Sequence, residues 1–116
     1  STVVVGLEMM RAVQEEMQEE KRNKDIIDSS VSTLSKLEKE AVICVFKRLT
    51  EMENMLVTSK VAQEEGITRS VIVNALRKLE SAGVLKTKSS GMKGTWIRIE
   101  NPTIFHEIRN FIKNRT

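Results

Sequence analysis

The sequence predicts a mainly α-helical fold with a small β-hairpin, namely a winged helix-turn-helix preceded by a long linker helix. Three observations predict it. After Gly6 the N-terminal stretch is rich in helix formers and free of Gly and Pro, two short helical segments meet across Gly66, and two strand-like segments follow at once. A chain of 116 residues has room for one such domain with a small core.

The first predicted helix runs from Leu7 to about Ile27 and carries apolar side chains at helical spacing. We expect it to break over residues 28–33, because short hydroxyl and carboxylate side chains compete for backbone hydrogen bonds. Residues 1–33 would then precede a winged domain formed by residues 34–116. The pattern leaves open whether this helix connects domains, contacts a second copy, or packs on the surface.

A second helix is predicted from Lys36 to about Arg48, because Ser35 and Glu38 have the spacing of a capping box. Its expected core face comprises Leu37, Ala41, Cys44, Val45 and Leu49, broadened by Val42, Ile43 and Phe46. The single cysteine, Cys44, cannot form an internal disulfide, and a buried, inert thiol in a reducing cytoplasm is the expected interpretation.

The helix-turn-helix follows. Thr58 or Ser59 is expected to cap a short helix through Glu65 that ends at Gly66, and Thr68 to cap a second helix over residues 69–82. Residues 84–89 and 95–99 are predicted to be strands joined by a Gly-containing loop. Beyond Pro102, a final helix is expected to bury the face that contains Ile104, Phe105, Ile108, Phe111 and Ile112.

The second helix of this motif has two distinct sides. Its inward side is predicted to hold Ile72, Ala75, Leu76, Leu79 and Ala82. Its outward side holds Ser70, Asn74, Arg77 and Ser81, flanked by Arg69, Val73 and Lys78. Amide, guanidinium, hydroxyl and methyl groups on one helix face are what the major groove of double-stranded DNA accepts, so this helix is predicted to bind it.

Position along the motif predicts individual roles. The N-terminal half of a recognition helix meets base edges, which assigns base reading to Arg69, Ser70, Val73 and Asn74. Arg77 and Lys78 are expected to contact bases or phosphates, and Ser59 and Lys60 phosphates at a helix N-terminus. Lys93, with Lys86 and Lys88, would bring the wing to DNA. The alternatives are a solvated helix face and strand lysines that only prevent aggregation.

The charge distribution supports this interpretation. The net charge is only +3, but residues 58–98 contain eight Lys and Arg against Glu64, Glu65 and Glu80, whereas acidic residues outnumber basic ones before Thr58. Apolar runs are too short to cross a bilayer, so we expect no membrane association and a cytoplasmic location.

An enzyme is not expected. The chain has one His, one Cys and no Gly-rich phosphate-binding loop, and acidic pairs such as Glu15 and Glu16 lie where a solvated helix face is the simpler explanation. We therefore expect no catalytic or metal site. The competing non-enzymatic function is a winged helix used for protein–protein contact or dimerisation.

Two stretches carry a family resemblance. Residues 62–84, which include the run ITRSVIVNALRKLESAGV from residue 67, and residues 91–95, GMKGT, closely resemble the CodY family. This resemblance implies the output domain of a global transcriptional regulator, a repressor, that responds to GTP and branched-chain amino acids. It also implies a homodimer and an AT-rich palindromic operator.

By the same resemblance, residues 3–6 would be the tail of a sensor domain that this chain lacks. The effectors are therefore expected to bind mainly outside it, and no cofactor is expected here. The chain departs from the family pattern at residues 63–65, where added acid is expected to weaken contact with the DNA backbone, and in the tail after Asn101.

Overall fold

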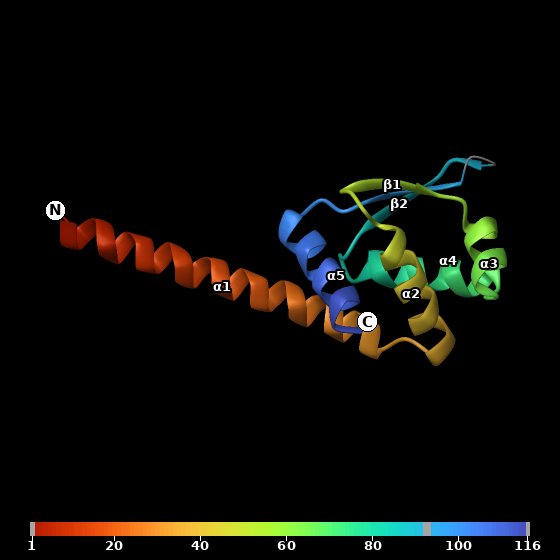
Figure 1. The fold of residues 1–116 in the computed structure, drawn as a ribbon, viewed down its shortest axis with the longest axis horizontal. Helices are drawn as coiled ribbons and strands as arrows, with labels where there is room; N and C mark the ends of the chain where they lie inside the picture. Colours follow the sequence, from red (N-terminus) through yellow and green to blue (C-terminus); the bar gives the residue numbers. More distant parts are fainter. Residues whose placement is uncertain (1, 92–93, 116) are drawn as a thin grey trace.

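The computed structural model describes residues 2–91 and 94–115 and consists of helices around a small sheet (Figure 1). Along the chain the elements are α1 (Thr2–Ser32), α2 (Lys36–Arg48), β1 (Glu53–Leu56), α3 (Thr58–Glu65), α4 (Arg69–Ser81), β2 (Lys86–Ser89), β3 (Thr95–Arg98) and α5 (Pro102–Arg115). This order confirms the mainly helical winged helix-turn-helix fold with a long preceding helix. None of the described helices is both long and apolar enough to cross a membrane.

Helix α1 projects from the rest of the molecule (Figure 1), and only its C-terminal end packs against other elements. Its 31 residues give a rod of about 46 Å, which accounts for most of the 61 Å length of the molecule. The predicted break over residues 28–33 is wrong, because the hydroxyls of Ser30 and Ser32 donate to carbonyls three residues earlier and stay within the helix. Burial of Ile27 and Val31 also favours its continuation.

Helix α2 begins as predicted. The Ser35 hydroxyl accepts from the Glu38 amide at 3.2 Å, and the Glu38 carboxylate accepts from the Ser35 amide at 3.0 Å. The expected core face is wrong at Leu37, whose side chain is 57% exposed. Val42 and Phe46 are fully buried instead, since α2 packs against both α4 and α5.

The sheet has one strand more than the predicted hairpin. β1, which the sequence did not indicate, pairs antiparallel with β3 and gives the order β1-β3-β2. Its four residues, ENML, lack the alternation of apolar and polar residues by which a strand is usually found. Pairing with β3 is therefore what makes this segment a strand.

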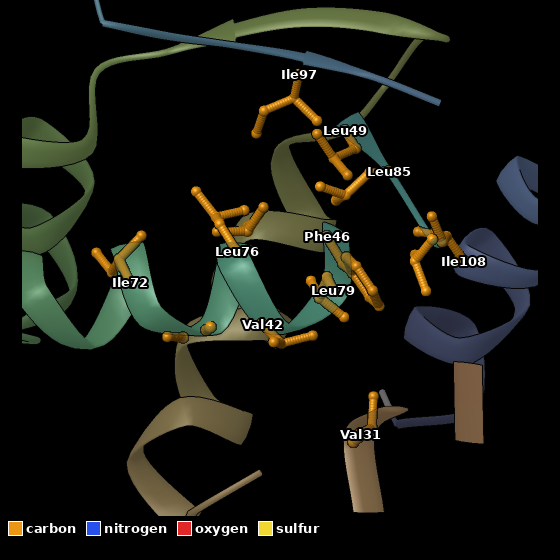
Figure 2. Packing of buried hydrophobic residues seen from close by; sticks show 14 of the residues in the cluster. Val31, Val42, Phe46, Leu49, Ile72, Leu76, Leu79, Leu85, Ile97 and Ile108 are labelled. Carbon is orange, nitrogen blue, oxygen red and sulfur yellow. The ribbon is translucent and has the colours of Figure 1, made fainter. Parts of the chain in front are cut away.

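The core lies between the sheet and the helices. Figure 2 shows Ile97 of β3 above Leu49 and Leu85, with Phe46, Leu79 and Ile108 packed below them. The Phe46 and Phe111 rings meet edge to face, with centroids 5.7 Å apart, which joins α2 to α5. The predicted apolar face of the final helix is confirmed, with Ile104 and Ile108 buried and the remaining members packed against the core.

A short polar network fastens α1 to the start of α5. The buried side-chain amide of Asn23 donates to the Thr103 hydroxyl, and Thr103 in turn donates to Asn101 Oδ1 through both its hydroxyl and its backbone amide. Asn101 lies three residues after the end of β3 at Arg98, so these three residues connect the projecting helix to the base of the wing.

Candidate nucleic-acid interface

Helices α3 and α4 meet at the predicted glycine turn. Gly66 has φ +67°, in the left-handed region that favours glycine, and the chain then turns into α4. The expected hydroxyl caps are not formed: Val57 is the N-cap of α3, and Thr68 precedes α4 without a side-chain cap bond. The Thr58 hydroxyl instead accepts from Arg69 Nε at 3.3 Å, so it links the two helices.

Helix α4 presents the predicted polar side to solvent. Ser70, Asn74, Arg77 and Ser81 are exposed, whereas Ile72, Ala75, Leu76 and Leu79 are buried. Ala82 is exposed because the helix ends at Ser81, one residue earlier than expected. Arg69 lies exposed at the first turn and Val73 is half-buried, so the residues assigned to base reading lie along one accessible surface.

Lys78 differs from its neighbours because its side chain forms an ion pair within the fold. Its Nζ lies 2.9 Å from a Glu38 oxygen, so it joins α4 to the capping box of α2. The Lys78 hydrogen bond and the two hydrogen bonds from Ser35 lower the pKa of Glu38 to about 2. Sequence alone assigned Lys78 to DNA; the structure gives it a partner within the chain.

The start of α3 leaves Ser59 and Lys60 exposed, as phosphate contacts at that position would require. The acidic residues at its other end are paired: Arg48 reaches Glu64 at 3.0 Å and Glu65 at 2.8 Å. Beside Arg48 the pKa of Glu65 is lowered, whereas burial and the neighbouring Glu65 carboxylate raise the pKa of Cys44. The raised pKa agrees with an inert thiol.

The two strands of the wing give the hairpin two different faces. Lys86, Lys88, Trp96 and Arg98 lie on one face by alternation, and Thr87, Ser89, Thr95 and Ile97 on the other, which faces α4. Lys86 lies 3.3 Å from Glu100, whereas Lys88 is exposed. Lys93, the remaining predicted wing residue, lies outside the described residues.

A contact that sequence reasoning missed fixes the wing to α4. Glu80 accepts from the Thr87 amide at 2.9 Å and from the Thr87 hydroxyl at 3.1 Å. Only the alternation of Lys and hydroxyl residues over residues 86–89 hinted that Thr87 and Ser89 share a face. The bond sets the position of the hairpin beside the exposed side of α4.

Comparison with known proteins decides the family. The model of the CodY helix-turn-helix domain matches residues 52–112, a span that contains α3, α4 and the wing. This chain belongs to the CodY family. The proteins named global transcriptional regulator CodY from Bacillus thuringiensis (strain Al Hakam), Bacillus cereus (strain AH187) and Bacillus anthracis (strain CDC 684 / NRRL 3495) are each 49% identical to it over 114 residues.

That similarity covers 98% of this CodY-family chain but only 44% of each relative. The chain therefore spans less than half the length of the curated relatives that it matches. Its matched region holds the helix-turn-helix, and the helix-turn-helix presents the polar surface described above.

Proposed function

We propose that this CodY-family chain binds double-stranded DNA sequence-specifically as the output domain of a bacterial transcriptional repressor, with α4 in the major groove. The observation that carries the proposal is that the side chains of Asn74 and Arg77 are exposed and unpaired among the described residues. Both are exposed at the centre of α4, and neither side chain has a hydrogen bond or ion pair with any residue that the structure describes. An amide reads adenine bidentately, and a guanidinium binds either a guanine edge or a backbone phosphate.

The direct test is a gel-shift titration against a duplex selected from a random DNA pool by this chain. Asn74→Ala combined with Arg77→Ala should weaken binding at least about thirtyfold, because a bidentate base contact and a charged phosphate contact each contribute at least about 1 kcal/mol. Gln14→Ala combined with Arg11→Ala removes the same groups from the exposed N-terminal half of α1 and should have little effect. Unchanged affinity of the α4 variant would refute the proposal.

Protein–protein contact through the winged domain is the competing function. It would place apolar side chains where Asn74 and Arg77 stand, and the resulting affinity would vary little with salt. DNA binding instead gives a logarithm of affinity that falls linearly with the logarithm of salt concentration. Titration at several salt concentrations therefore separates the two functions.

We also propose that the full-length protein is a homodimer that reads an AT-rich palindrome, since winged regulators commonly bind two-fold symmetric sites. The N-terminal half of α1 supports a protein contact, because it exposes Val3, Val4, Val5, Leu7, Met9, Met10, Val13 and Met17. If this helix suffices, sedimentation equilibrium will show dimers that Met10→Lys with Met17→Lys converts to monomers and that Gln14→Lys does not. A GC-rich or asymmetric selected site would contradict the palindrome.

The family resemblance further supports control by GTP and branched-chain amino acids, acting mainly on a sensor domain outside this chain, in the cytoplasm. For the 116-residue chain the expected result is that GTP with isoleucine leaves DNA affinity unchanged. An increase in affinity on their addition would place an effector site among these residues.

A further inference from the structure

A cleft of about 350 Å³ lies between α4 and the wing, beside the helix surface assigned to base edges, with which it shares Arg69 and Val73. From α4 it is lined by Arg69, Val73, Leu76 and Arg77, and from the wing by Thr87, Ser89 and Thr95. Two guanidinium groups and three hydroxyls therefore face one space, and none of its lining residues is acidic. Such a set of donors selects an anion.

Antiparallel pairing brings two of the hydroxyls together. Ser89 lies directly opposite Thr95 on the face of the hairpin that looks toward α4. Neither side chain has a hydrogen-bond partner within residues 2–91 and 94–115. Thr87 differs, because its hydroxyl already donates to Glu80. Ser89 and Thr95 are thus the free hydroxyl donors of the wing side.

The opposite wall supplies the charge. Arg77 is exposed and has no partner among the described side chains, and Arg69 uses only its Nε, on Thr58, which leaves its two terminal amino groups free. Between them, Leu76 is buried and Val73 is half-buried, so the floor of the cleft is apolar. An apolar floor beneath two cations strengthens their attraction for an anion relative to fully solvated cations.

We propose that this cleft holds one backbone phosphodiester of the DNA, bound between Arg69 and Arg77 of α4 and the hydroxyls of Ser89 and Thr95. This phosphodiester site rests on the proposed function, because α4 must lie in the major groove for the adjacent DNA strand to pass beneath the wing. Arg69 and Arg77 then fix the register of the helix on the duplex. Base reading by the polar face is left to Ser70 and Asn74. This differs from the sequence-based assignment of Arg69 and Val73 to bases, and it gives Arg77 the phosphate contact that was one of its two predicted roles.

Substitution gives the first test. Arg77→Gln should lower affinity by the same factor for the selected duplex and for a scrambled one, and should reduce the salt slope by about 0.9. Ser89→Ala with Thr95→Val should weaken binding to both duplexes about tenfold with no change in slope, because hydroxyls carry no charge. Arg98→Gln is the matched control: it removes an equal charge from the outer face of the same hairpin, where Arg98 lies 3.8 Å from Glu53.

Single methylphosphonate substitutions in the selected duplex give the second test, because each removes one backbone charge. A methylphosphonate at one particular phosphate should weaken binding by the wild-type chain about tenfold. The same substitution should cause no further loss of affinity for the Arg77→Gln variant or for the variant altered at Ser89 and Thr95. Circular dichroism of each variant should match the wild type, since Arg77, Ser89 and Thr95 have no partner among the described residues and Arg98 has only an exposed ion pair with Glu53.

The outcomes separate this proposal from the proposed function. If the wild-type chain selects no duplex, DNA binding itself fails. If it binds DNA but every methylphosphonate affects wild type and variants alike, the phosphodiester site is refuted while DNA binding stands. Titration with inorganic phosphate tests whether the cleft binds a free anion in place of a DNA phosphodiester. Shifts of the Ser89 and Thr95 amide resonances at micromolar phosphate, with no methylphosphonate position that distinguishes wild type from the variants, would also overturn the proposal.

Discussion

Gly94 fixes the position of the wing, and its replacement by Ala tests how closely the hairpin packs. A Cβ at this position would lie 2.4 Å from the Leu56 carbonyl oxygen, 2.9 Å from the Leu56 carbonyl carbon and 3.1 Å from Val57 Cα. These are backbone atoms at the end of β1, so no side-chain rotation relieves the clash. Gly94 also has φ +108°, a conformation that L residues rarely adopt.

Both effects add to the cost of Gly94→Ala. The backbone conformation costs about 1–3 kcal/mol, and relief of the overpacked contact about 1–3 kcal/mol more. We therefore expect the free energy of unfolding to fall by about 2–6 kcal/mol, a large part of the stability of a small domain. Urea unfolding followed by circular dichroism measures the loss, and Trp96 fluorescence reports on β3 itself.

Gly91 provides a matched control in the same loop. It has φ +62°, but a Cβ there meets nothing within 4 Å, so Gly91→Ala should cost only about 1–2 kcal/mol. Any gain from a less flexible unfolded chain is common to the two variants and cancels in their difference. Equal stability of Gly94→Ala and Gly91→Ala, within about 0.5 kcal/mol, would refute the close packing of the hairpin on β1.

Three further predictions concern contacts between helices. Because the pKa of Glu38 is lowered to about 2, the ionised carboxylate should stabilise the fold above pH 4.5, and this stabilisation should be lost as pH falls from 4.5 toward 2. Urea midpoints of wild type and Glu38→Gln, compared across this pH range, measure the loss. Phe46→Leu and Phe111→Leu, alone and together, should give a coupling energy of about 1 kcal/mol in urea unfolding. Asn23→Ala should cost about 1–3 kcal/mol in the same measurement, because the Thr103 hydroxyl loses its buried donor.

Each of these has a contradicting result. A difference between wild type and Glu38→Gln that stays constant from pH 7 to pH 3 would exclude the ion pair with Lys78 as its source. Additive effects of the two Phe substitutions would show that the edge-to-face contact adds nothing beyond burial. Asn114→Ala on exposed α5 surface is the control for Asn23→Ala, and equal small effects would discount the α1 to α5 network.

Local signals predicted most of the fold, because the chemistry that fixes each element lies within it. The Ser35 and Glu38 capping box set the start of α2, and Gly66 set the turn between α3 and α4. Helical periodicity likewise separated the buried from the exposed side of α4, and four of its five predicted inward residues are buried. Only Ala82, beyond the end of the helix, falls outside this pattern.

Sequence reasoning failed where a distant segment decides the outcome. β1 is a strand because β3 pairs with it, and α1 continues past Asp28 because Ile27 and Val31 pack on the core. The partner of Lys78 lies forty residues away on α2, and Ser89 meets Thr95 only once the hairpin has formed. None of these long-range contacts changes the local spacing of apolar and polar residues from which the helices and strands were predicted.

The charged residues of the motif divide into two groups that the sequence does not distinguish. Lys78 and Lys86 pair with Glu38 and Glu100, and Arg48 pairs with the two acids of α3, so these charges are balanced inside the fold. Arg48 therefore offsets one of the two negative charges of the acidic pair that was expected to weaken contact with DNA. Lys60, Arg69, Arg77 and Lys88 have no ion pair with any described residue and are exposed. The surface that α3, α4 and the wing present thus keeps these four exposed cations without an ion pair among the described residues, whereas Glu80 is the acid of α4 beside the wing, so positive charge is more concentrated here than the net charge of +3 indicates.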